Sequence, residues 1–247
     1  MTVTRPRLLW RVATVRELRE ETAHAKTLVL DVPDWSGHRA GQHVDVRLTA
    51  EDGYQAQRSY SIASAPEARE VELTIERIDD GEVSPYLTED ARVGDQFELR
   101  GPIGGYFVWD ASSTAPLLLV AGGSGLVPLM AMLRHHRNIG SSVDARLLLS
   151  ARAIDDVLYR DELERLRSAS AGIHITLTRG EPPTGWGGFS GRIEAEMLRT
   201  VGPSPPESPG VYVCGPTPFV ERAAELLVEL GHDPGHVHTE RFGPTGG

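Results

Sequence analysis

The sequence LLLVAGGSGLVP at residues 117–128 joins a continuous apolar run to a glycine-rich turn and then to a helix-like pattern. After a buried strand, such glycines let a dinucleotide phosphate approach the N-terminus of the following helix. Gly122, Gly123, Ser124 and Gly125 are therefore candidate nucleotide-binding residues. The spacing differs from the strict Gly-x-Gly-x-x-Gly fingerprint, and glycines at such a junction often form only a tight turn.

The second half of the chain alternates continuous apolar runs with helical patterns. Fully apolar strands separated by helices are typical of a parallel sheet that is covered on both faces. We therefore predict a C-terminal α/β doubly wound parallel-sheet domain that binds a nucleotide. Its expected strands lie at 117–121, 147–149, 173–177 and 211–213, and its expected helices at 126–137, 159–167 and 218–230.

The first half follows a two-residue period instead. Val44, Val46 and Leu48 alternate with polar neighbours, as do residues 71–75 and 97–99. This pattern predicts an N-terminal antiparallel Greek-key β-barrel, with one short helix starting near Ser84. A small polar stretch ends at Pro116. We expect it to separate two domains, at 1–111 and 116–247.

Composition excludes several functions. The formal net charge of −10 argues against non-specific binding to nucleic acid, which relies on Lys and Arg. A single cysteine, Cys214, excludes an intrachain disulfide and a protein-bound iron–sulfur cluster, which takes about four cysteine ligands. No signal peptide or membrane span is expected, which leaves the cytoplasm as the predicted compartment. The charged run at 16–21 is expected to be a solvated face.

Arg58, Tyr60 and Ser61 suggest a flavin site at a strand end. Arg58 and Tyr60 share a strand face, with Ser61 on the other face or at a bend. A guanidinium suits the flavin pyrophosphate, an aromatic ring lies well against the isoalloxazine, and a hydroxyl can form a hydrogen bond with N5. Taken alone, these residues also fit an ordinary strand with a solvated Arg and a packed Tyr.

At these residues the chain resembles the ferredoxin–NADP reductase superfamily, whose flavin motif is Arg-x-Tyr-Ser or Arg-x-Tyr-Thr. The resemblance continues at Gly81-Glu82-Val83-Ser84, similar to the family's Gly-x-x-Ser segment. It implies that Gly81, Val83 and Ser84 hold the pyrophosphate of FAD, which FMN lacks. The stretch 101–107 is similar to the family's Gly-Pro-x-Gly-x-Phe, with one extra residue, so either Tyr106 or Phe107 takes the family position.

Four residues are expected to bind the pyridine nucleotide's ribose and phosphate. Ser150 and Arg152 follow the second parallel strand, where an acidic residue favours a free 2′-hydroxyl and an arginine favours a 2′-phosphate. Arg179 and Arg192 follow further along the chain. The arginines favour NADPH, while similar Ser-Arg and Gly-Arg pairs in NADH-using relatives keep NADH open.

Cys214-Gly215-Pro216 ends the last apolar strand, at the edge that faces the flavin domain. The resemblance implies that Cys214 sits against the nicotinamide, although a lone cysteine in an apolar strand is more often structural. It also makes Glu240, which precedes an aromatic in the last residues, a candidate for relaying protons, against a frayed terminus as the alternative. His232, His236 and His238 lack supporting ligands, so no metal site is expected.

The resemblance implies hydride transfer from NADPH or NADH to FAD, with Ser61 and Cys214 flanking the transfer and Glu240 nearby. Single electrons would then pass to a separate acceptor protein, such as a ferredoxin, a flavodoxin or a metalloenzyme. Three alternatives stay open: a free-flavin reductase, an electron-transfer subunit of a larger complex, and a binding module without turnover.

Overall fold

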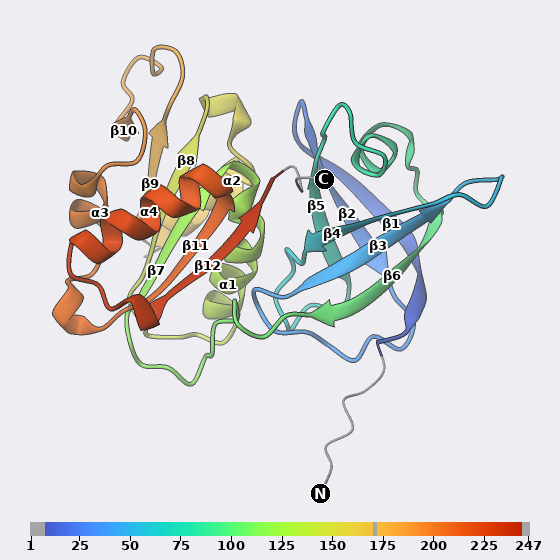
Figure 1. Cartoon of the computed structure of the whole chain (residues 1–247), viewed down its shortest axis with the longest axis horizontal. Coiled ribbons are helices and arrows are strands. Elements are labelled where there is room, and N and C mark those ends of the chain that lie inside the picture. The colour runs from blue at the N-terminus through green and yellow to red at the C-terminus, as the bar shows by residue number, and fades with distance from the viewer. Residues whose placement is uncertain (1–7, 170–171, 244–247) are drawn as a thin grey trace, which may run out of the picture.

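The computed structural model describes residues 8–169 and 172–243, and these form two six-stranded sheets that lie beside each other (Figure 1). One sheet is antiparallel and comes from the first half of the chain, and the other is parallel and comes from the second half. The predicted two-part architecture is therefore confirmed.

The antiparallel sheet has the strand order β4-β3-β6-β1-β2-β5. Its two ends meet, because Ile62 just after β4 bridges to Leu73 of β5, and the Ala63 N–H donates to the Glu72 carbonyl at 2.8 Å. The sheet thus closes into a barrel around apolar side chains that include Val46, Leu73 and Leu99. The strands are β1 (Trp10–Thr22), β2 (Ala25–Asp31), β3 (His43–Thr49), β4 (Gln55–Ser61), β5 (Val71–Glu76) and β6 (Gln96–Ile103), with a short helical segment, η1, at Tyr86–Asp90.

The parallel sheet has the order β10-β9-β8-β7-β11-β12. Helices α1 and α2 cover one face and α3 and α4 the other, so neighbouring residues of β7 such as Leu117 and Leu118 enter different cores. Because both faces are buried, these strands read as continuous apolar runs. The elements are β7 (Leu117–Gly122), α1 (Leu126–Asn138), β8 (Ala145–Ala151), α2 (Arg160–Ala169), β9 (Gly172–Leu177), β10 (Phe189–Ser190), α3 (Ala195–Val201), β11 (Gly210–Pro216), α4 (Thr217–Glu229) and β12 (Val237–Phe242).

Two charged segments turn out to belong to strands. The run at 16–21 lies inside β1 with none of its residues buried, and its last residue, Glu21, accepts a hydrogen bond from Thr27 at 2.6 Å. Register shifts at Val15/Glu17 and Glu20/Thr22 break the two-residue period there, which hides the strand in the sequence. Glu240 is likewise part of β12, paired with Cys214, and not a frayed end. The last residues, 244–247, lie outside the described part.

No helix in the described part of the chain combines the length and the apolar character needed to cross a membrane. Within residues 8–169 and 172–243, no cluster of three or more His, Cys, Asp or Glu side chains is arranged to hold a metal ion.

Candidate active site

A cavity of about 1030 Å³ lies between the carboxyl edge of the parallel sheet and one side of the barrel. Crevices at this edge of open α/β sheets are where ligands bind. The sheet side of the cavity is lined by the turn after β7 and by the ends of β8, β9 and β11. The barrel side is lined by Thr22, His24, Ala25, Glu76, Arg77 and Asp79.

The glycine-rich turn needs glycines for two reasons, close packing at some positions and a left-handed backbone at another. A Cβ at Gly125 would lie 2.1 Å from the Cys214 carbonyl oxygen, and one at Gly122 would lie 2.7 Å from the Phe219 ring, so both positions require close packing. Gly123 has φ +55°, a left-handed conformation, and has nothing within 4 Å of a Cβ position. Gly123 and Ser124 line the cavity at the beginning of α1, which leaves open space for a ligand phosphate.

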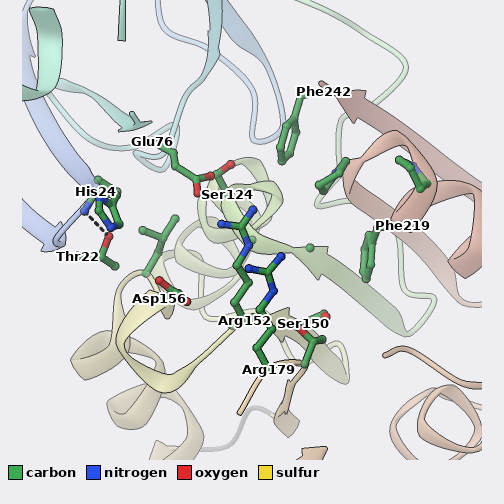
Figure 2. A pocket seen from close by; sticks show the side chains of 18 of the residues that line it. Thr22, His24, Glu76, Ser124, Ser150, Arg152, Asp156, Arg179, Phe219 and Phe242 are labelled. Carbon is green, nitrogen blue, oxygen red and sulfur yellow. Dashed lines mark hydrogen bonds between the residues drawn. The ribbon is translucent and has the colours of Figure 1, made fainter. Parts of the chain in front are cut away.

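Three arginines line the same cavity. Arg152 and Arg179 follow adjacent strands, and the Arg179 backbone N–H donates to the Arg152 carbonyl at 2.9 Å. Figure 2 shows their side chains extending into the cavity that also holds Ser124 and Ser150. Arg192 follows β10. None of these guanidiniums has an ion-pair partner among the described residues, in a chain of net charge −10. They form a site suited to an anion.

Cys214 and Glu240 are neighbours on adjacent parallel strands, where the Cα register pairs them. Cys214 is 2% exposed, and burial, together with the Glu240 carboxylate, raises the pKa of its thiol. Burial also raises the pKa of Glu240 to about 7, so its carboxyl is poised to hold or release a proton near neutral pH. Gly215 approaches Gly122 and Phe219 closely, while Pro216 lines the cavity.

The structure brings the two flavin-type motifs together. Arg58 Nη2 of β4 donates to the Glu82 carboxylate at 2.9 Å, and the Tyr54 hydroxyl donates to the same carboxylate. Tyr60 is half-buried against the barrel core, and Ser61 ends β4. A guanidinium, an aromatic ring and a hydroxyl therefore occur on one strand, a donor set that fits FAD.

The loop 81–84 is tightly built. A Cβ at Gly81 would lie 2.9 Å from both the Ile78 carbonyl and the Ser84 hydroxyl oxygen. The Ser84 oxygen accepts the Ile78 N–H at 3.1 Å, and Val83 is fully buried in the barrel core. Val83 therefore offers only its backbone to a ligand, while the Ser84 hydroxyl also serves the loop itself.

Sequence reasoning missed the barrel side of the cavity and several residues of α4 and β12. This cavity is not lined by the residues of the flavin motifs, and several expected nucleotide-site residues are also absent from its lining: Gly125, Cys214, Gly215 and Glu240. It is lined instead by residues such as Thr22, Glu76 and Phe242. Glu76 directly follows the predicted strand 71–75, and Phe242 is the aromatic after Glu240, so these two carried a signal. Of the two aromatics left open, Phe107 is buried and packs edge-on to Tyr212 at 5.5 Å, while Tyr106 is 62% exposed.

The molecule combines an antiparallel barrel, whose donor set fits FAD, with a parallel sheet, whose edge carries a cavity suited to a nucleotide. This combination defines a flavoprotein oxidoreductase that uses NAD(P)H. Residues 13–108 match the family described as oxidoreductase FAD-binding domain, and residues 119–225 match the oxidoreductase NAD-binding domain. The chain is 38% identical over 236 residues to ferredoxin–NADP reductase B of Sorangium cellulosum, covering 92% of this chain and 91% of that relative. The chain belongs to the ferredoxin–NADP reductase superfamily, whose cofactors are FAD and NAD(P)H.

Two further comparisons agree with this assignment. The chain is 34% identical over 232 residues to the glycine betaine monooxygenase reductase subunit of Chromohalobacter salexigens, covering 92% of this chain and 62% of that subunit's length. The FAD/NAD-binding domain of nitric oxide dioxygenase from Vibrio cholerae superposes with a TM-score of 0.84 at 26% identity, covering 95% of this chain and 99% of that one.

Proposed function

We propose that this protein passes a hydride from NADPH to FAD and then passes single electrons to a separate redox protein. The observation that carries the proposal is the cavity, which places three unpaired arginines and the Gly123–Ser124 turn opposite the flavin-type barrel. We take residues 1–111 as the FAD-binding domain and 116–247 as the NAD(P)-binding domain, in keeping with the ranges of the two sheets.

When bound, NADPH supplies the hydride, and FAD accepts it and divides the electron pair into single electrons. Arg58 and the backbone of Gly81, Val83 and Ser84 bind the flavin pyrophosphate in this proposal. Tyr60 supplies an aromatic face for the isoalloxazine, and Ser61 supplies a hydroxyl for N5. The protein thus orients the two reacting rings.

Cys214, Gly215 and Pro216 form the end of β11 on the nucleotide side. The Cys214 thiol is kept neutral by burial, so it offers a small polarisable surface to the nicotinamide. Glu240 holds a proton at its carboxyl below about pH 7 and can release it above that value.

We assign NADPH over NADH because Ser150 and the guanidiniums of Arg152, Arg179 and Arg192 line the cavity without competing carboxylate partners in the described residues. A 2′-phosphate accepts such charge-assisted hydrogen bonds, whereas a ribose hydroxyl gains much less from them. The turn 122–125 receives the nucleotide phosphates at the N-terminus of α1.

The acceptor proposed is a ferredoxin, a flavodoxin or the metal centre of an oxygenase, because relatives of this chain carry names such as monooxygenase reductase subunit. The proposed compartment is the cytoplasm.

Anaerobic titration of the purified protein tests the function. The visible spectrum is recorded before and after adding NADPH, and separately after adding NADH. We expect a yellow protein whose flavin band bleaches with NADPH. A colourless protein would instead favour a free-flavin reductase, and a yellow protein that neither nucleotide bleaches would favour a docked subunit or an inactive module.

A further inference from the structure

Four side chains close a ring of hydrogen bonds between the two halves of the molecule. The Tyr159 hydroxyl donates to Thr74 Oγ1, and the Tyr159 backbone N–H donates to Glu21 Oε2 at 3.2 Å. Thr27 donates to Glu21 Oε1 at 2.6 Å, and the Thr27 and Thr74 hydroxyls lie 2.7 Å apart. Because the single Thr27 hydrogen goes to Glu21, Thr74 must donate to Thr27. The hydroxyl hydrogen bonds then run in one direction from Tyr159 through Thr74 and Thr27 to Glu21, whose carboxylate also accepts the Tyr159 backbone N–H.

This ring spans the interface. Tyr159 directly precedes α2, whereas Glu21, Thr27 and Thr74 belong to β1, β2 and β5 of the barrel. Tyr159 and Thr74 are each 5% exposed, and Thr27 is fully buried. Water does not compete for hydrogen bonds at such positions, and an unmade bond there leaves a buried polar group without a partner.

The same tyrosine receives a second support from α1. The Arg134 guanidinium lies 5.0 Å from the Tyr159 ring centre and forms ion pairs with Glu72 of β5 at 2.8 Å and Glu162 of α2 at 2.6 Å. Helix α1 follows the glycine turn directly, so the turn and the segment before α2 are both tied to the barrel.

Three residues of the ring have close sequence neighbours that line the cavity. Leu158 precedes Tyr159, Thr22 follows Glu21, and Glu76 lies two residues after Thr74 on the same strand face, and all three of these neighbours line the cavity. Tyr159 also has φ +53°, a left-handed conformation that a bulky residue adopts only where its surroundings hold it. Residues 152–159 therefore run from the candidate phosphate-binding Arg152 to an anchored end on the barrel.

We propose that Tyr159 is a positioning residue for the pyridine nucleotide. Its hydroxyl, through Thr74, holds the segment 152–159 at a set separation from the barrel, which keeps Arg152 and the cavity walls ready for the ligand. This inference rests on the proposed function and adds to it a residue that does not itself line the cavity. Releasing the anchor lowers the fraction of molecules in the binding-competent arrangement, and the apparent affinity falls by the same factor.

The test uses Tyr159→Phe, which keeps the ring over Arg134 and removes only the hydroxyl. We expect the dissociation constant of NADP⁺, measured by calorimetry on the FAD-loaded protein, to rise about five-fold, as for the loss of one net hydrogen bond. The KM for NADPH should rise similarly, with kcat and FAD content nearly unchanged. Thr74→Val should weaken NADP⁺ binding to the same extent, whereas Thr74→Ser, which keeps the hydroxyl, should bind NADP⁺ as the wild type does. The double variant Tyr159→Phe/Thr74→Val should bind no worse than either single variant.

Tyr212→Phe is the matched control. The Tyr212 hydroxyl also bridges the two halves, donating to the Val108 carbonyl at 3.0 Å, but neither residue lines the cavity. We expect this control to lower the melting temperature without weakening NADP⁺ binding. Equal weakening in Tyr212→Phe, or unchanged affinity in Tyr159→Phe, would overturn the positioning role and leave only a structural one.

Hydrogen exchange without any nucleotide separates this inference from the proposed function. Backbone amides at 152–158 should exchange faster in Tyr159→Phe than in the wild type or in Tyr212→Phe. If the wild type is not reduced by either nucleotide, the proposed function fails, while the exchange result still decides whether Tyr159 holds the segment. Unchanged exchange would overturn the inference even in an active enzyme.

Discussion

The two candidate cofactor sites hold their arginines in opposite ways. On the barrel, Arg58 is paired with Glu82, whose carboxylate also accepts the Tyr54 hydroxyl. On the parallel sheet, Arg152, Arg179 and Arg192 line the cavity with no carboxylate partner in the described residues. A phosphate at Arg58 therefore has to share or replace an existing ion pair, whereas one at the sheet edge meets free guanidiniums. Binding at Arg58 therefore includes the cost of displacing the Glu82 carboxylate, whereas binding at the sheet edge does not include such a cost.

The largest effect is expected at the flavin site. Arg58→Ala should raise the dissociation constant of FAD about 100-fold, because charge-assisted hydrogen bonds to the pyrophosphate are lost. The flavin-to-protein absorbance ratio after dialysis measures this. Arg16→Ala is the control, since Arg16 of β1 forms an exposed ion pair with Asp31 of β2. A fully FAD-loaded Arg58→Ala protein would contradict the assignment of Arg58 to the flavin pyrophosphate. The contrast between paired and unpaired arginines would then no longer concern two cofactor sites.

A somewhat smaller and more selective effect is expected at the nucleotide site. Arg152→Ala should raise the KM for NADPH about 30-fold and leave the KM for NADH within about two-fold, because only NADPH carries the 2′-phosphate. Steady-state kinetics with both nucleotides measures the difference. Arg199→Ala, at an exposed ion pair with Glu196 on α3, should change neither value. Equal losses for the two nucleotides would count against the 2′-phosphate role.

The last effect concerns Glu240 and changes the stability of the fold without changing the affinity for either cofactor. Burial raises its folded-state pKa from 4.5 to about 7, so between these values the folded protein binds a proton that the unfolded chain has released. The stability from this proton is fully present below about pH 4.5, declines as the pH rises through this interval, and is gone once the pH passes about 7. From pH 5 to pH 8, the urea midpoint of the wild type should fall relative to Glu240→Gln by on the order of 1 M, since about 1.4 kcal/mol per pKa unit is divided by an m-value of about 3 kcal/mol per M.

Glu225→Gln, an exposed position on α4, is the control for that comparison and should follow the wild type at both pH values. A wild type whose midpoint changes with pH in parallel with that of Glu240→Gln would show that the carboxyl does not titrate in this range. The pH dependence would then have to come from other groups.

The parallel half was predictable because its information is local. Strand β7 and helix α1 begin at Leu117 and Leu126, as expected, since an apolar run buried on both faces looks the same in the sequence as in the fold. Strand β1 of the barrel and strand β12 of the parallel sheet were not recognised. The register shifts of β1 interrupt its alternation, and β12 becomes a strand only by pairing along β11.

The candidate sites were likewise predictable only where their residues lie close together in the sequence. The sequence alone determined the chemical types and their order: Arg58, Tyr60 and Ser61, then the 122–125 turn, then Cys214. Each of these motifs lies within a few residues, where chain connectivity guarantees proximity. Only the tertiary structure decided that Glu82 pairs with Arg58, that Glu240 lies beside Cys214, and that Tyr159 ties the nucleotide side to Thr74 of the barrel. These contacts join residues 24 to 85 positions apart. They depend on how sheets close and pack, which no local pattern encodes.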